Sequence, residues 1–139
     1  MNPPFTPEYF NHISKGSLPA HLGIVVTAVG DGEVSAECEV TAKLLAPNGF
    51  LHAGSVVTLA DTTCGFGCIA QLPEGASSFT TIELKSNHLG TAREGSISAT
   101  AKLVHQGRTT QVWDAVVSNK ATGKTIALFR CTQMILYPK

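Results

Sequence analysis

Residues 48–72 read NGFLHAGSVVTLADTTCGFGCIAQL, and this stretch decides the fold. Its one charged residue is Asp61, and the nearest charged residues on either side are Lys43 and Glu74. No proline intervenes between His52 and Gln71, and the run is too long for an ordinary strand. We therefore expect a helix over about residues 52–71 that is apolar on nearly every side.

The length and composition of the chain indicate one domain over residues 1–139. A chain of 139 residues can bury a real core but is too short for two comfortable domains. Apolar residues make up 43% of the chain and charged residues 14%, with a formal net charge of zero. A nucleic-acid-binding protein would carry a basic excess, so this class is excluded. The low charge also suits an oligomer, because part of the surface would then be interface.

The first ten residues, MNPPFTPEYF, lack the basic start and apolar run of a secretory signal. The apolar segment is interrupted by polar residues and a carboxylate, so we do not expect a membrane span. The four cysteines, Cys38, Cys64, Cys68 and Cys131, show no C-x-x-C spacing. We expect a cytoplasmic protein with reduced thiols. Cys64 and Cys68 could share a helix face, but small buried side chains are favoured there over a metal pair.

The remaining elements are predicted from turn residues and alternation. A short helix is expected between Thr6 as its N-cap and Gly16 as its stop, with Pro7 in the first turn. Residues 23–40 predict two strands around the turn at residues 30–32. Within the second strand, apolar residues at 34, 36, 38 and 40 alternate with polar ones, which indicates an antiparallel sheet with one solvated face. Four later strands are expected at about 78–90, 96–106, 109–118 and 125–137.

These elements predict an α+β fold. A helix that is apolar all round must be enclosed, and one sheet can enclose it only by curling around it. We expect a curled antiparallel sheet of about six strands around one long central helix, with the short helix at the N-terminus. One stripe of the central helix would stay uncovered, and a second copy of the molecule would close that side.

Two interpretations of Asp61 remain open from the residue pattern. The carboxylate could be a structural group held by local hydrogen bonds, for example to Thr58 or Thr62. It could instead be a catalytic base or nucleophile, since a charged Asp without a partner in an apolar site costs several kcal/mol or takes up a proton. No Lys or Arg lies nearby in the sequence to pair with it. A lone acid in so apolar a segment therefore makes a functional site a serious candidate.

The start of the same helix offers a second candidate group. Its first backbone N–H groups have no partner within the helix and carry the positive end of its dipole. Ala53 and Gly54 scarcely shield these donors, so a carbonyl oxygen gaining negative charge could bind there. Ala53 and Asp61 are eight residues apart, about 12 Å along a helix. One carbonyl cannot reach both in one chain, but two antiparallel helices from two subunits could bring them together.

Three quoted stretches, NGFLHAGSVVTLADTTCGFG, TTIELKSNHLGTAREG and GRTTQVWDAVVSNKATGKTIALFRCT, resemble the hotdog-fold acyl-CoA thioesterases. The phenylacetate-pathway (PaaI-like) and 4-hydroxybenzoyl-CoA types are the most similar, through their HGG…LAD or HGG…LAE helix start. The resemblance begins at about residue 20 and covers nearly all of the chain after it. It implies a hotdog fold and hydrolysis of an acyl-CoA thioester to free acid and CoA.

The resemblance also implies roles for individual residues. Asp61 corresponds to the acid that acts as base or nucleophile, and the Ala53 N–H to the donor that polarises the thioester carbonyl. Family members carry a Gln or Asn six residues before the His, where this chain has Ala46; Asn48 is the candidate replacement. Thr81, near the start of the strand after the helix, corresponds to an assisting hydroxyl. His52 is expected to shape the loop through a backbone hydrogen bond.

The CoA phosphates require cations. The resemblance favours Arg93 and Arg108, the latter with its neighbour Thr109, because the guanidinium fork suits phosphate. Further candidates are Lys85 and Lys120. The acyl pocket is expected to be apolar, formed near Asp61 by Phe50, Leu51, Phe66 and Phe79. No metal and no cofactor are implied, since CoA is part of the substrate, and the expected assembly is a homodimer or a homotetramer built from dimers.

Two other functions compete with hydrolysis. A hotdog hydratase or dehydratase would use a His and a carboxylate that converge across the dimer, and His52 with Asp61 satisfy that pattern. The proline-rich His loop expected of that class is, however, missing around His52. A non-catalytic acyl-CoA binding domain would keep the pocket but would leave Asp61 without a purpose.

Overall fold

The apolar segment forms the central helix of the molecule. The computed structural model describes residues 5–139, and α3 (Ala53–Ala70) runs through the middle of it. The predicted helix was one residue longer at each end. His52 and Gln71 instead have non-helical backbone angles, with ψ of 132° and 18°, and act as the two caps.

Across residues 5–139 the strands form one six-stranded antiparallel sheet in the order β1-β2-β4-β5-β6-β3. The strands lie within two residues of their predicted ranges. They are β1 (Val25–Gly30), β2 (Glu33–Glu39), β3 (Ser78–His88), β4 (Ser96–Gln106), β5 (Thr110–Asn119) and β6 (Thr125–Leu136). The predicted α+β architecture is therefore confirmed, and β1 and β3 are the edges of an open sheet.

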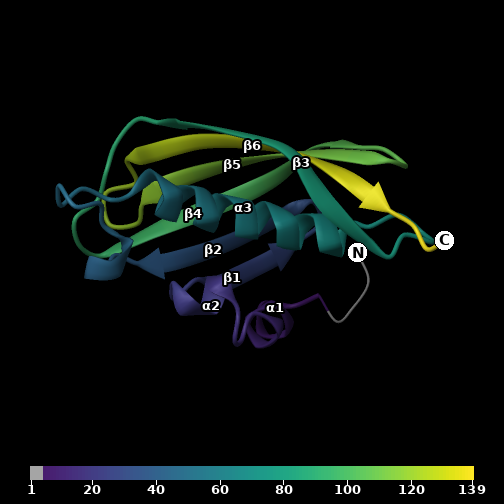
Figure 1. Ribbon diagram of the computed structural model, residues 1–139, viewed down its shortest axis with the longest axis horizontal. Helices are drawn as coiled ribbons and strands as arrows, with labels where there is room; N and C mark the ends of the chain where they lie inside the picture. The colour runs from purple at the N-terminus through teal and green to yellow at the C-terminus, as the bar shows by residue number, and fades with distance from the viewer. Residues whose placement is uncertain (1–4) are drawn as a thin grey trace.

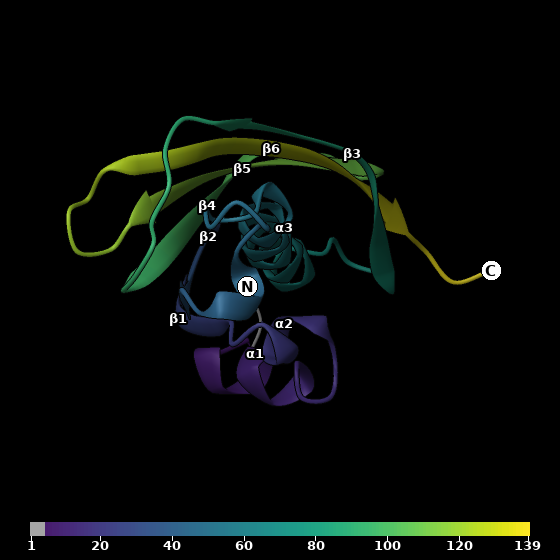
Figure 2. The ribbon, with the colours of Figure 1, turned by 60° about the vertical axis from the view of Figure 1, so that its left-hand side comes forward.

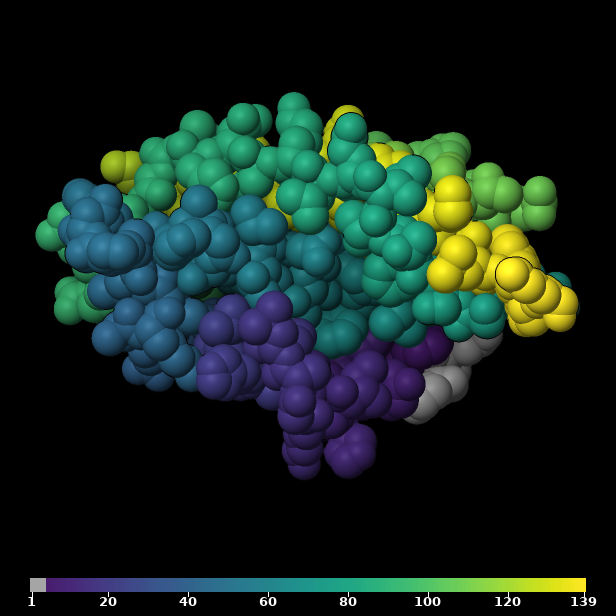
Figure 3. Space-filling model, in the orientation of Figure 1, coloured from purple at the N-terminus to yellow at the C-terminus, as the bar shows by residue number. Residues whose placement is uncertain are grey.

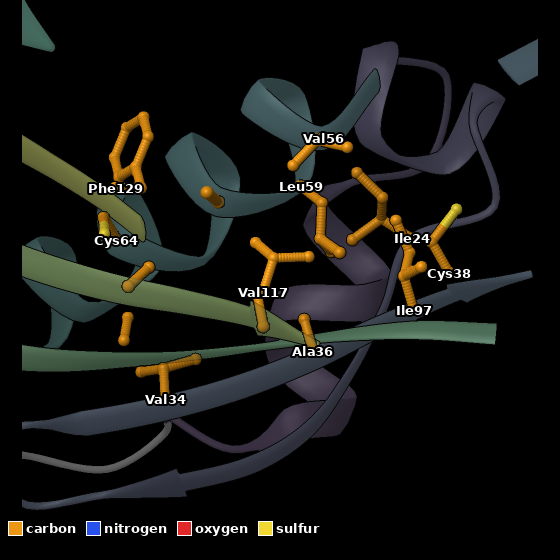
Figure 4. Packing of buried hydrophobic residues seen from close by; sticks show 14 of the residues in the cluster. Ile24, Val34, Ala36, Cys38, Val56, Leu59, Cys64, Ile97, Val117 and Phe129 are labelled. Carbon is orange, nitrogen blue, oxygen red and sulfur yellow. The ribbon is translucent and has the colours of Figure 1, made fainter. Parts of the chain in front are cut away.

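The sheet curls around α3, which lies along its concave side (Figures 1 and 2). Alternate residues of the strands point inward, as their polar and apolar alternation predicted. Figure 4 shows Val34, Val117 and Phe129 of the sheet facing Val56 and Leu59 of the helix. By length and composition α3 could cross a membrane, but half of it is buried inside the protein, as expected for a core helix.

The N-terminal segment packs against the open side of this arrangement below β1 (Figure 2). In α1 (Pro7–Ile13) the Thr6 hydroxyl accepts a hydrogen bond from the Tyr9 N–H at 3.1 Å, so the predicted N-cap is confirmed. The helix ends at Ile13, before the predicted stop, with Ser14 as its C-cap; the Ser14 hydroxyl and N–H both donate to the Phe10 carbonyl. Gly16, with φ of 79°, turns the chain into a helix that was not predicted, α2 (Leu18–His21).

The last turn of α3 is tied to the sheet by neutral amide groups. The Gln71 carbonyl accepts hydrogen bonds from the side-chain amides of Gln106 at 2.8 Å and Gln111 at 2.9 Å. The indole of Trp113 donates to the Gln111 side-chain oxygen at 2.8 Å. A short 3-10 helix, η1 (Ala42–Leu44), leads from β2 towards the opposite end of α3. The Gln106 and Gln111 amides thus satisfy the Gln71 carbonyl, which the helix end would otherwise leave without a partner.

Close packing between α3 and β5 depends on a glycine. A Cβ atom on Gly67 would lie 2.6 Å from the Cη2 and Cζ3 atoms of Trp113, nearer than carbon atoms can approach. Trp113 is fully buried and held by its indole hydrogen bond, so it has no free space to move into. Gly67 therefore sets the separation between the helix and the sheet.

Gly67→Ala should destabilise the protein by about 1–3 kcal/mol, the usual cost of overpacking a core. Helix propensity alone predicts the opposite sign, because Ala is favoured over Gly in a helix interior by about 1 kcal/mol. Chemical denaturation measures the difference. An increase in the free energy of unfolding would show that the indole does not restrain the helix.

Candidate functional site

One stripe of α3 is not covered by the sheet. Its residues recur at helical spacing and stay partly or fully accessible in the single chain; they are Gly54, Thr58, Asp61, Thr62 and Ile69. In the space-filling view, teal atoms of the helix are visible between the purple N-terminal segment and the greener β3 (Figure 3). Asp61 lies in the middle of this stripe, as the sequence pattern required.

The carboxylate of Asp61 has no partner within the described residues. Its Oδ1 atom is buried and accepts no hydrogen bond from residues 5–139. The expected structural partner, Thr58, donates its hydroxyl instead to the Gly54 carbonyl at 2.8 Å. Burial raises the pKa of Asp61 above its ordinary value, because the charged form loses hydration. Residues 5–139 thus provide no local hydrogen bond of the kind that the structural interpretation of Asp61 requires.

Asp61 borders a cavity of about 170 Å³ on the open side of the helix. The remaining lining residues are Pro19, Thr62, Gly65, Phe66, Ile69 and Phe79. The sequence analysis placed Phe66 and Phe79 here correctly but missed the others. Helical spacing from Asp61 could have found Gly65 and Ile69, whereas no sequence signal places Pro19 of α2 beside them.

His52 caps α3 with its imidazole. The Nδ1 atom accepts a hydrogen bond from the Gly54 N–H at 2.7 Å, so the predicted backbone contact of His52 is present. A Cβ atom on residue 54 would lie 2.9 Å from that nitrogen, so this position requires a glycine. The Gly54 N–H is thereby occupied. The Ala53 N–H has no acceptor among the described residues and is the donor left available for a substrate oxygen.

Asn48 lies in the turn that precedes His52. Its Oδ1 atom accepts a hydrogen bond from the Phe50 N–H at 3.1 Å, and Gly49 has φ of 86°. The turn is closed by the Ala46 N–H, which donates to the Phe50 carbonyl at 2.7 Å. The Asn48 side chain is exposed, and its amide N–H groups stay available. Ala46 offers no polar side chain, so no group of this turn other than Asn48 can replace the family's amide.

Thr81 faces the concave side of the sheet on β3. Its hydroxyl donates to the Oε1 atom of Gln133 at 2.6 Å, and Gln133 is fully buried. The Gln133 amide in turn lies 3.5 Å from the Cys131 sulfur. With its proton committed to Gln133, the Thr81 hydroxyl keeps its oxygen available as an acceptor, and Thr81 does not line the Asp61 cavity of its own protomer.

Arg93 lies near the start of α3. Its guanidinium stacks over the Phe50 ring, 4.5 Å from the centroid. A hydrogen bond from the Leu51 N–H to the Thr91 hydroxyl, at 3.3 Å, joins the same two loops. Phe50 and Leu51 therefore belong to the loop beside the helix start and do not line the Asp61 cavity. Within one protomer they lie apart from Phe66 and Phe79, and a pocket shared by all four stays a prediction for the assembled dimer.

The other predicted phosphate-binding residues are spread over the molecule. Arg108 and Thr109 are exposed in the turn between β4 and β5, near the last turn of α3, with the guanidinium 5.9 Å from the Tyr137 ring centroid. Lys85 pairs in register with Arg130 on the outer face of the sheet, turned away from α3. Lys120 forms an ion pair with Glu37 at 2.9 Å. Lys85 and Lys120 are thus not placed to bind a ligand of the Asp61 cavity in the same protomer.

All four cysteines are free and buried, as expected for small core residues. Among residues 5–139, no group of three or more His, Cys, Asp or Glu side chains is arranged to hold a metal ion. Burial is the largest cause that raises the pKa of Cys68, to about 12, so this thiol is not a nucleophile.

Comparison with known proteins decides the family. The family model described as the thioesterase superfamily matches residues 48–126, which include α3 and its N-terminal loop. The chain belongs to the thioesterase superfamily. This thioesterase is 33% identical to the 1,4-dihydroxy-2-naphthoyl-CoA hydrolase of Listeria monocytogenes over 83% of the chain and 92% of that protein.

Solved structures agree with this thioesterase in fold. A mutant thioesterase from Pseudomonas aeruginosa superposes with a TM-score of 0.90 at 31% identity, covering 95% of this chain and 94% of the other. The PaaI protein of the Escherichia coli phenylacetic acid degradation operon gives a TM-score of 0.80 at 27% identity, over 90% and 88% of the two chains. The resemblance stated from the sequence, the hotdog fold and the enzyme class are therefore confirmed.

Asp61→Asn should stabilise the folded protein at neutral pH by about 1 kcal/mol, since a partly buried charge without a partner is costly. The native pKa of Asp61 is raised, so wild-type stability falls as the pH rises from the ordinary Asp value through the native pKa. The advantage of the variant should therefore vanish in acid, below the ordinary Asp pKa. Thermal melting at several pH values measures it.

Asp114→Asn is the matched control. Asp114 is ion-paired with Arg130, so its amide variant should be neutral or less stable at neutral pH. A lower melting temperature for Asp61→Asn at pH 7 would show that the carboxylate has a stabilising partner.

Proposed function

We propose that this thioesterase hydrolyses an acyl-CoA to the free acid and CoA, with the Asp61 carboxylate as the catalytic base or nucleophile. The observation that carries the proposal is the buried, unpartnered Oδ1 atom of Asp61 at a cavity on the open stripe of α3. A group kept in so costly a state is typical of a catalytic site. The name of the Listeria relative, a CoA hydrolase, supports CoA as the leaving group.

In the proposed reaction, the thioester carbonyl oxygen accepts a hydrogen bond from the Ala53 N–H. The positive end of the α3 dipole stabilises the charge that develops there. Asp61 either removes a proton from an attacking water or attacks the carbonyl itself. The second route gives a mixed anhydride that water then opens, and both routes release CoA as a thiolate. The reaction needs no cofactor, because water and one carboxylate are sufficient for it.

The site requires two copies of the chain. Asp61 and Ala53 are about 12 Å apart along α3, so one carbonyl cannot contact both within a protomer. We propose a homodimer in which two antiparallel α3 helices face each other through their uncovered stripes. The partner's helix start would then oppose Asp61, giving two sites in each dimer.

Strand β3 supports this dimer. It is an eleven-residue edge strand, and Ile82, Leu84 and Leu89 in or beside it are 54%, 43% and 63% exposed. A long apolar edge is a template for pairing with another strand. The outer face of the sheet also exposes Val116 and Leu128, which supports a second contact and a homotetramer of two dimers.

The CoA phosphates are assigned to Arg93 and to Arg108 with Thr109. Within one protomer Arg93 lies near the start of α3 and Arg108 near its end. Antiparallel pairing would bring the start of one helix beside Asp61 in the middle of the other, so that an arginine from each protomer could flank one site. Asn48, with free amide N–H groups, is proposed to orient water or substrate, and Thr81 to accept a hydrogen bond from the attacking water.

Because the proposed substrate is a CoA thioester and the cysteines are free, we place the reaction in the cytoplasm.

The competing functions fit the geometry less well. A hydratase or dehydratase would need His52 as a base, but with Nδ1 accepting the Gly54 N–H the neutral ring carries its proton on Nε2 and has no free lone pair for that role. A non-catalytic acyl-CoA binding domain would gain nothing from an unpartnered carboxylate beside the acyl group. Hydration of crotonyl-CoA, followed by absorbance, tests the first alternative directly.

A panel of acetyl-, hexanoyl-, benzoyl-, phenylacetyl- and naphthoyl-CoA, with thiol release followed, tests the proposed function. Wild type should hydrolyse at least one member, and Asp61→Asn should lower kcat/KM by at least about 10²-fold, as expected for a lost general base. Full activity of Asp61→Asn, or no hydrolysis of any member by wild type, would contradict the proposal.

Ala53→Pro tests the carbonyl donor. Proline is tolerated in the first helical position, and His52, with φ of −66° and ψ of 132°, already has the backbone that a following proline requires. The variant should fold normally but lose about 10²–10³-fold in kcat, because it lacks the N–H. Ala53→Gly, which keeps the N–H, is the control and should retain most activity. Equal rates for the two variants would remove the donor from the mechanism.

Mixing the two inactive variants tests the shared site. In a dimer of Asp61→Asn with Ala53→Pro, one site receives both defects and the other receives none. Random reassortment of the subunits should therefore restore about a quarter of the wild-type specific activity, since half of the dimers have one intact site. No restoration after verified exchange would place the whole site within a single protomer.

A further inference from the structure

We infer that Phe79, packed on Gly65, sets the depth of the acyl pocket and restricts this thioesterase to compact acyl groups. The inference rests on the proposed function and deepens it, because it concerns the substrate of the same site. It begins with the row formed by Asp61, Gly65 and Ile69, which follow one another at four-residue spacing along the cavity.

The ring of Phe79 meets the helix one turn beyond Asp61. A Cβ atom on Gly65 would lie 3.1 Å from Phe79 Cζ and 3.8 Å from Cε2. The edge of the ring therefore lies directly against the helix backbone, and no acyl chain can pass between them. The approach is possible because residue 65 lacks a side chain, so the two residues act as one wall.

The neighbouring wall is held rigidly by the N-terminal segment. Phe66 stacks on Phe10 with 4.5 Å between ring centroids, and Phe10 is fully buried. Pro19 of α2 lines the same cavity. Phe79, in contrast, lies near the start of the edge strand β3 and is only partly buried. Of the two aromatic lining residues, Phe79 is therefore the one that can be changed with less effect on the rest of the core.

The size of the cavity agrees with a compact acyl group. Within one protomer its volume is about 170 Å³, and the partner's helix start would close it further. The apolar lining offers no charged group other than Asp61. One ring or a short branched chain fits in this volume, whereas a long fatty acyl chain would have to displace Phe79.

The experiment measures kcat/KM for a series of straight-chain acyl-CoAs from acetyl to dodecanoyl, together with benzoyl- and naphthoyl-CoA. Wild type should lose activity steeply beyond the compact members. Phe79→Ala should raise kcat/KM for the longest members relative to the shortest by about tenfold or more, as expected for a few added methylenes in an apolar pocket. Phe79→Leu, a milder change, should shift the profile in the same direction and guards against misfolding.

Two further variants make the test specific. Gly65→Ala forces the Phe79 ring to move and should penalise the bulkiest accepted acyl group, and the penalty should disappear when Phe79→Ala is added. Ile135→Ala is the matched control, because Ile135 pairs with Phe79 across β3 and β6 and is buried but does not line the cavity. It should lower stability without changing the acyl profile.

The outcomes separate the two proposals. If wild type hydrolyses part of the series but Phe79→Ala and Phe79→Leu keep its profile, the pocket-depth inference is wrong and the proposed function stands. A wild-type preference for dodecanoyl-CoA would also overturn the inference. If no thioester is hydrolysed by wild type, the proposed function fails, and the inference fails with it.

Discussion

The structure depends on one constraint: an apolar helix lies inside a sheet too narrow to surround it. Six strands curl around α3 but leave one stripe accessible, and Asp61 lies in that stripe. The carboxylate has neither a hydrogen-bond donor within the described residues nor full hydration. Its charge is therefore costly in the resting protein, and a group that binds on this side can change that cost.

The covered and uncovered sides of α3 have different roles. On the covered side, Gly67 packs against the indole of Trp113, and the helix has no freedom to shift towards the sheet. On the open side, Gly54 and Gly65 let His52 and Phe79 come close to the helix backbone. Glycines on both sides thus serve close approach, so substitutions at each would affect different properties of the enzyme.

Much of the fold could be predicted from the sequence because it depends on local patterns. The unbroken apolar run predicted α3, and turn residues together with alternation in two segments predicted the strands. The helix α2 was missed because four residues carry little local signal, and with it the place of Pro19 in the cavity. Strand β3 contains a bulge between Thr81 and Glu83, and such an irregularity hides which face Lys85 occupies.

The candidate site divides in the same way. Asp61 and the helix start were predictable, since both follow from the position of α3 alone. The position of Phe50 within the protomer was not predictable from its place in the sequence next to His52. The turn at Asn48 folds towards Arg93 instead, and that contact joins loops far apart in the chain. Contacts of this kind depend on the assembled sheet and leave no periodic trace in the sequence.

The amide groups at the end of α3 have a consequence for how the enzyme responds to acid. Gln71 is held by Gln106 and Gln111, which neither gain nor lose a proton in water. The bonds from the Gln71 carbonyl to β4 and β5 are therefore insensitive to acidity, whereas the Gln71 side-chain amide donates to the Asp31 carboxylate at 3.1 Å. Protonation of the Asp61 carboxylate can thus abolish catalysis while the helix end stays bound to β4 and β5.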